Sequence, residues 1–144
     1  MEKIFFEIEK DGFYGTYYIN PKESCCAMIG LFGDDPNDYM AKCGAKWLHD
    51  QGVNVLCMSP GKKNYSHVNC PLERIETAVK WLKNNGNKKV GIVGMSTAGM
   101  DALVAASFFQ DITLTFALTP SDFVWQGFEQ GNKDGCKEWP IPGA

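Results

Sequence analysis

The segment Gly94–Ala98, which reads GMSTA, has the residue types and the spacing of a serine nucleophile held on a sharp turn. A short apolar run, 90–93, precedes it, and a long apolar stretch with helical spacing follows Gly99. This pattern is typical of a nucleophile elbow, in which a strand ends, a serine occupies the turn and a helix begins. The segment therefore predicts a strand, a turn with Ser96 at its apex, and a helix.

A serine hydroxyl is a poor nucleophile unless a base removes its proton and N–H groups stabilise the oxyanion. The N–H of Thr97 opens the predicted helix, where the helix dipole also favours negative charge. The second donor is expected from the loop Gly33–Asp34, whose glycine allows close approach of a substrate carbonyl. Gly94 and Ala98 are expected to give the elbow the room that its tight turn needs. These residues together predict acyl transfer through Ser96.

Two other interpretations of the same segment remain open. A serine between a strand and a helix is also a good helix N-cap. A flavodoxin-like nucleotide- or flavin-binding module could instead use Ser96 and Thr97 to hold a phosphate at the helix N-terminus. The glycines nearby fit neither GxGxxG nor GxxxxGK[ST], and we expect no cofactor and no metal.

The base and the acid of a catalytic triad are harder to find. The chain has two histidines, His49 and His67, and both precede Ser96, whereas the triad of this elbow runs serine, acid, histidine along the chain. His49 is expected at the end of a helix, and His67 on a loop after a strand. Asp122 follows the last predicted strand, one strand earlier than the acid is expected. No residue after Ser96 supplies the base.

The elements that must position Ser96 follow from periodicity. Two strand-like runs, 4–8 and 13–19, flank Asp11-Gly12, which predicts an antiparallel hairpin within residues 1–20. Strands then alternate with helices over residues 24–118, and residues 119–144 are expected to form a loop. The expected elements of that core are strands at 25–32, 53–58, 89–93 and 112–118, with helices at 39–49, from 71 to 84 and from the elbow to 109. Apolar residues recur at helical spacing in the first two of these helices, namely Tyr39, Cys43, Trp47 and Leu48, and then Leu72, Ile75, Ala78, Val79 and Leu82. An Asp or Asn of the loop 33–38 is expected to cap the first helix. This order predicts one α/β domain with a mostly parallel, doubly wound sheet.

Composition excludes several other classes of protein. The 144 residues carry 14 basic and 17 acidic side chains, so the net charge of −3 gives no basic footprint for nucleic acid. No stretch has the length of a membrane helix, and the N-terminus has no apolar signal region. The six cysteines show no CxxC pair and no zinc-ligand spacing. We expect a cytoplasmic protein whose partner is a small molecule, with no nucleic acid and no membrane.

Three segments together resemble one known family. The segment 90–99, the run 105–113 and the tail from Gly127 to Gly143 are similar to the C-terminal catalytic domain shared by acyl-CoA thioester hydrolases and bile acid-CoA:amino acid N-acyltransferase. The resemblance implies an α/β-hydrolase fold and an acyl-enzyme on Ser96, with an ester or acyl thioester as substrate. It also implies a histidine that accepts the serine proton and an aspartate that orients the histidine.

This chain departs from the family in two ways. Ala98 stands where many members carry glycine, and the strands that would bring the acid and the histidine do not follow 112–118. The resemblance therefore implies the N-terminal portion of a domain, impaired alone and open at its last strand to a second copy or to a complementing fragment. A dienelactone-hydrolase-like or peptidase-like α/β-hydrolase is the alternative within the same fold.

Overall fold

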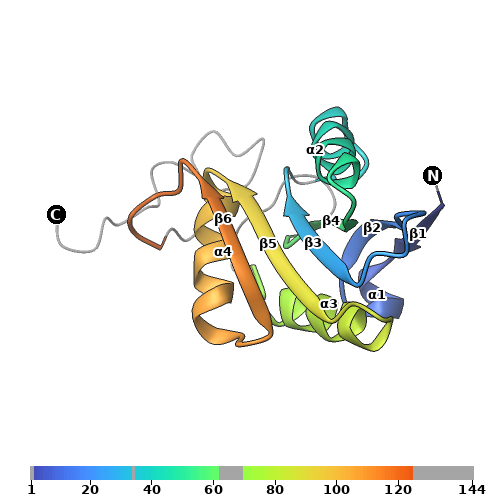
Figure 1. Cartoon of the computed structure of the whole chain (residues 1–144). Helices are drawn as coiled ribbons and strands as arrows, with labels where there is room; N and C mark the ends of the chain where they lie inside the picture. Colours follow the sequence, from blue (N-terminus) through green and yellow to red (C-terminus); the bar gives the residue numbers. More distant parts are fainter. Residues whose placement is uncertain (1, 34, 62–69, 125–144) are drawn as a thin grey trace, which may run out of the picture.

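The computed structural model describes residues 2–33, 35–61 and 70–124, and in these residues six strands form one sheet (Figure 1). The strand order is β1-β2-β4-β3-β5-β6. Strands β3, β4, β5 and β6 are parallel, whereas β2 pairs antiparallel with β4 at one side. The chain starts the parallel part at β3, adds β4 on one flank, and then crosses to β5 and β6 on the other. The predicted doubly wound, mostly parallel sheet is confirmed.

The N-terminal strands, β1 (Lys3–Phe6) and β2 (Tyr14–Tyr18), pair antiparallel as the sequence predicts. The connection differs from the expected tight Asp-Gly turn, because one helical turn, α1 (Ile8–Asp11), joins them. The Asp11 carboxylate accepts a hydrogen bond from the Glu7 N–H at 2.9 Å, and Gly12 ends the turn at φ 80°. Asp and Gly therefore close a helical turn here, which moves the start of β2 to Tyr14.

Strand β3 (Cys26–Leu31) leads into α2 (Tyr39–Asp50), and β4 (Asn54–Ser59) follows. The side chain of Asp38 caps α2 by accepting from the Ala41 N–H at 2.7 Å, in agreement with the predicted Asp or Asn cap. Of the apolar residues expected at helical spacing on α2, Leu48 is buried, whereas Tyr39, Cys43 and Trp47 are exposed. The sheet side of α2 instead presents small residues and one leucine, namely Ala41, Ala45 and Leu48.

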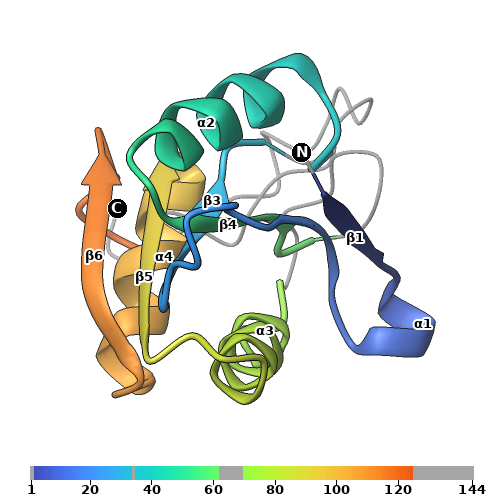
Figure 2. The ribbon, with the colours of Figure 1, turned by 45° about the vertical axis from the view of Figure 1, so that its right-hand side comes forward.

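The remaining elements are α3 (Glu73–Asn84), β5 (Lys89–Met95), α4 (Thr97–Phe108) and β6 (Ile112–Leu118). The predicted apolar stripe of α3 is buried, and β6 has the predicted bounds. Helix α2 covers one face of the sheet and α3 the other, as Figure 2 shows. Helix α4 joins the core on the α3 side, through Ala98, Ala102 and Ala105. None of the helices in the described parts of the chain is both long and apolar enough to cross a membrane.

Candidate active site

Ser96 lies at the carboxyl end of β5, between the last residue of that strand and the first residue of α4. Its backbone has φ 56° and ψ −125°, a conformation that L-residues rarely adopt. An ordinary N-cap residue has an extended backbone, and its side chain accepts a hydrogen bond from the first turn of the helix. Ser96 has neither property: its hydroxyl makes no capping hydrogen bond, and the residue is exposed. The N-cap interpretation therefore does not explain this serine.

The turn brings β5 and α4 too close for a side chain at Gly94. A Cβ atom on Gly94 would lie 2.1 Å from the carbonyl oxygen of Ala98, which is a backbone atom and cannot rotate away. Gly99 is less tight, although a Cβ there would still lie 3.1 Å from the carbonyl oxygen of Gly94. Ala98 is buried, and its methyl group joins the core. The glycine and alanine positions of the elbow are thus set by the close approach of strand and helix.

The backbone N–H and carbonyl of Ser96 are hydrogen-bonded within the protein, whereas the N–H of Thr97 is not bonded to any described residue. The Ser96 N–H donates to the carbonyl of Leu118 at 2.9 Å, which ties the turn to the end of β6. The Ser96 carbonyl accepts from the N–H groups of Gly99 and Met100, at 2.9 and 3.1 Å. The N–H of Thr97 has no acceptor among the described residues. It therefore remains available at the positive end of α4.

The loop after β3 lies beside the elbow because of the strand register. Leu31 is opposite Gly94 in the parallel pair β3–β5, so Gly33 and Ser96 each lie two residues beyond paired positions. Gly33 has φ 145°, which a glycine adopts without strain. Asp34, the other residue predicted for the oxyanion loop, lies outside the described residues.

A buried hydroxyl on β2, which the sequence does not reveal, holds this loop. Thr16, fully buried on β2, donates its hydroxyl hydrogen to Oδ1 of Asn37 at 2.9 Å. The N–H of Asn37 in turn donates to Oδ1 of Asp35 at 2.9 Å. No local pattern could have revealed the first contact, since its partners are 21 residues apart and meet only in the folded sheet.

The histidine that the structure describes, His49, does not lie beside Ser96. His49 lies near the end of α2, at the opposite edge of the sheet from Ser96, and its Nε2 is 3.2 Å from the carbonyl oxygen of Ile19. His67 lies outside the described residues. Asp122 follows β6 and is exposed. No described side chain forms a hydrogen bond with the Ser96 hydroxyl.

The described residues contain no cluster of side chains that could hold a metal ion. No group of three or more His, Cys, Asp or Glu side chains converges in them. The chemistry that this edge of the sheet can offer is an exposed hydroxyl, a free N–H beside it, and a neighbouring loop that begins with glycine.

Comparison with known proteins identifies the fold. No family model matches the sequence, and no curated protein matches it. Among solved structures, the chain is similar to the esterase Pf2001 of Pyrococcus furiosus, with 20% identity and a TM-score of 0.63 over 80% of this chain and 53% of that one. It is also similar to the α/β hydrolase GrgF from Penicillium sp. sh18, with 22% identity and a TM-score of 0.65 over 83% of this chain and 45% of the other.

A third similar structure is Est1E from Butyrivibrio proteoclasticus, with 20% identity and a TM-score of 0.61 over 82% of this chain and 51% of that one. These likenesses, together with the strand order and the elbow, show that the described residues have the α/β-hydrolase fold. The chain spans about half the length of these solved structures. The resemblance to the thioester hydrolase and acyltransferase family is not supported by a family model, since none matches this sequence.

Proposed function

We propose that Ser96 is the nucleophile of an ester or acyl thioester hydrolase and forms an acyl-enzyme. The observation that carries this proposal is the conformation of Ser96, an exposed serine at φ 56° whose hydroxyl does not cap its helix. A left-handed backbone at a residue other than glycine costs about 1–3 kcal/mol, and such strain is concentrated at functional sites. A serine that served only as a cap would adopt an extended backbone and avoid this cost.

The N–H of Thr97 and an N–H from the loop Gly33–Asp34 stabilise the oxyanion in this proposal. Support comes from the free Thr97 N–H at the start of α4 and from the register that places Gly33 beside the elbow. When Oγ of Ser96 bonds to the substrate carbonyl carbon, the carbonyl oxygen becomes negatively charged. Two N–H donors in this region lower the energy of that charge.

The proton of Ser96 must pass to a base, and from there to the leaving alcohol or thiol as the bond to the carbonyl carbon breaks. We propose that a histidine and an acid from outside the described residues supply this step, on this polypeptide or on a complementing one. An apolar row on β6 supports an origin beyond this strand, since Leu114 and Phe116 are 59% and 49% exposed. The chain of 144 residues alone is then expected to retain only weak activity.

The proposed hydrolase could act on either of two substrate classes, an ester or an acyl thioester. The family resemblance favours an acyl-CoA thioester, with water or an amine as acceptor, whereas the similar solved structures are described as esterases or α/β hydrolases. We propose an acyl thioester as the preferred substrate. Comparison of butyryl-CoA with p-nitrophenyl butyrate on the same preparation tests this preference: a higher kcat/KM for the ester would contradict it.

Labelling with a fluorophosphonate probe tests the nucleophile itself. The probe should modify Ser96, slowly in the chain of 144 residues and faster in any longer product of the same reading frame, as read by peptide mass spectrometry. Ser96→Ala should abolish the labelling. Ser107→Ala, which removes another exposed serine hydroxyl from the same helix, should leave it unchanged. Modification of other serines with Ser96 unlabelled would refute the assignment, and rapid labelling of the short chain would show that a base is already present.

A further inference from the structure

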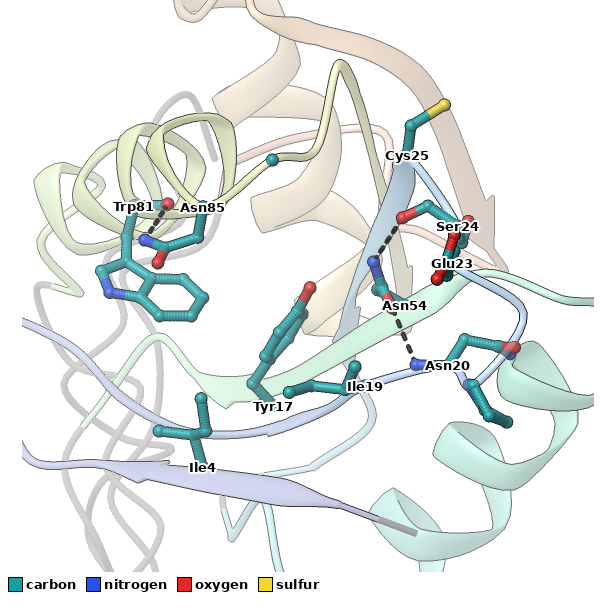
Figure 3. Close-up of a pocket in the computed structure, with 12 residues that line it drawn as sticks. Ile4, Tyr17, Ile19, Asn20, Glu23, Ser24, Cys25, Asn54, Trp81 and Asn85 are labelled. Carbon is teal, nitrogen blue, oxygen red and sulfur yellow. Dashed lines mark hydrogen bonds between the residues drawn. The ribbon is translucent and has the colours of Figure 1, made fainter.

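A cavity of about 520 Å³ lies at the edge of the sheet opposite Ser96 (Figure 3). It is formed where β2 ends, β3 and β4 begin and α3 ends, and its volume lies in the range of small-molecule sites. Ligands of open α/β sheets bind at the carboxyl ends of the strands, so the proposed chemistry at Ser96 does not account for this cavity. It needs an explanation of its own.

One wall of the cavity is a satisfied asparagine network. Asn54 accepts from the Asn20 N–H at 2.8 Å and donates to the carbonyl of Ser24 at 2.9 Å and to Oδ1 of Asn87 at 2.8 Å. These asparagines are buried, and each of them binds backbone or another amide. They fix the shape of the wall, and their hydrogen-bonding groups are already used by the protein.

The hydroxyl of Tyr17 is different, because its hydrogen lacks a good acceptor. The oxygen accepts from Nδ2 of Asn87 at 3.1 Å, whereas the acceptor that the described residues offer to its hydrogen, Oδ1 of Asn87, is 3.5 Å away and already bound to Asn54 at 2.8 Å. Figure 3 shows this hydroxyl pointing into the space between Trp81 and Asn54. Burial raises the pKa of Tyr17, so the hydroxyl keeps its hydrogen at neutral pH.

The rest of the lining is aromatic and aliphatic. The rings of Tyr17 and Trp81 meet edge to face, with centroids 5.2 Å apart, and Ile4 and Ile19 complete the apolar part. A planar apolar body of a few carbon atoms can pack against these groups while its polar end faces Tyr17.

Charge at the cavity disfavours an anion. The lining contains one carboxylate, that of Glu23, and no lysine, arginine or histidine among the described residues. The C-terminus of α3 also lies at its rim, at Asn85 and Gly86, and this end of a helix carries partial negative charge. A carboxylate or phosphate would meet repulsion here without a cation to offset it.

We propose that this cavity binds a small, uncharged aromatic molecule through a hydrogen-bond acceptor, such as an amide or ketone oxygen, that takes the hydrogen of Tyr17. The site is independent of Ser96 and of any acyl transfer there. A cationic amine lacks the acceptor that Tyr17 requires, and an aromatic acid meets the Glu23 carboxylate and the end of α3.

Titration of the protein with benzamide, benzoate and benzylamine, followed by amide and indole NMR shifts, tests the proposal. Benzamide should shift the indole N–H of Trp81 and the amides of Ser24 and Gly86, at millimolar concentrations. Benzoate and benzylamine should bind at least about tenfold more weakly, since each loses or opposes one of the contacts above. Equal or tighter binding of benzoate or benzylamine would overturn the proposal, as would shifts confined to other parts of the chain.

Variants locate the contact. Tyr17→Phe should weaken benzamide binding by about three- to tenfold, the usual effect of one hydrogen bond. Tyr18→Phe, the neighbouring tyrosine on the opposite face of the sheet, is the matched control and should leave it unchanged. Glu23→Gln removes an exposed charge without altering the core and should reduce the discrimination against benzoate. Ser96→Ala should have no effect on any of these titrations, so failure of this site and failure of the proposed nucleophile are separate results.

Discussion

The two edges of the sheet use polar groups in opposite ways. At the carboxyl edge, Ser96 carries an exposed hydroxyl that binds no described side chain, and its backbone has a positive φ. At the amino edge, Asn20, Asn54 and Asn87 are buried and bind one another and the backbone. The elbow thus leaves a hydroxyl free on a strained residue, whereas the asparagines of the amino edge use their polar groups internally.

This difference indicates which edge stabilises the fold and which edge is available for chemistry. A buried amide with satisfied hydrogen bonds contributes to stability, and its removal leaves its partners without their hydrogen bonds. A strained, exposed serine costs stability and is retained only where the surrounding structure enforces it. Relief of the backbone strain at Ser96 should therefore raise the free energy of unfolding, whereas removal of a buried asparagine at the amino edge should lower it.

The largest loss of stability is expected at the amino edge. Asn54→Ala leaves the Asn20 N–H, the Ser24 carbonyl and Oδ1 of Asn87 without their partner and should lower the free energy of unfolding by about 3–4 kcal/mol. Urea denaturation measures this change. The control is Asn85→Ala, an exposed amide bound to one helix carbonyl, which should cost about 1 kcal/mol or less. Similar losses in both variants would remove the distinction between the edges.

Gly94→Ala should cost about 3 kcal/mol, because its Cβ would lie 2.1 Å from the Ala98 carbonyl oxygen and the close approach of β5 and α4 would have to widen. Gly52→Ala is the matched control, since Gly52 has φ 87° but nothing within 4 Å of an added Cβ. It should lose only about 1 kcal/mol from the left-handed backbone. A smaller loss for Gly94→Ala than for Gly52→Ala would show that the elbow is not tightly packed.

Ser96→Gly should raise the free energy of unfolding by about 1 kcal/mol, because glycine adopts φ 56° without the strain that serine carries. Ser107→Gly, in the last turn of α4, should lower it by about 0.5 kcal/mol, since glycine is a weaker helix former than serine and loses the hydrogen bond from the Ser107 hydroxyl to the Val104 carbonyl. Thermal or urea unfolding of the two variants gives the sign directly. Destabilisation by Ser96→Gly would mean that the elbow holds no strain.

The last expected effect is absent at neutral pH: the stability of the protein should depend on alkaline pH through Cys57, in the centre of the sheet between the two edges. Burial, with a smaller contribution from the Asp38 carboxylate, raises the pKa of the Cys57 thiol to about 12 from its ordinary value of 9.0. In the unfolded chain this thiol ionises above pH 9, whereas in the folded protein it keeps its proton, so stability falls as the pH rises from 9 toward 12. Cys57→Ala removes this contribution, and the loss of stability between pH 8 and about 10.5 should be less steep in the variant. Parallel pH curves for the two proteins would contradict the raised pKa.

Local patterns predicted much of this architecture. The stripe of α3, the bounds of β6 and the cap at Asp38 were correct, because each depends on periodicity or on a contact three residues away. Helical spacing of apolar residues on α2 predicted the buried side only at Leu48, since Tyr39, Cys43 and Trp47 are exposed. Helix α2 lies close to the sheet, where a Cβ on Gly44 would lie 2.4 Å from the ring of Phe32, so small side chains face inward and Trp47 faces outward.

The candidate site divides in the same way. The segment GMSTA by itself determined a turn between a strand and a helix with a serine at its apex, because Gly94 permits the close approach that this turn requires. Tertiary structure decided that Ser96 adopts φ 56° with its hydroxyl uncapped, through the packing of α4 on β5 and the hydrogen bond to Leu118 on β6. It also decided that Thr16 holds the loop after β3 and that three asparagines meet at the opposite edge. Those contacts join residues 21 or more positions apart, and only the pairing of the strands brings them together.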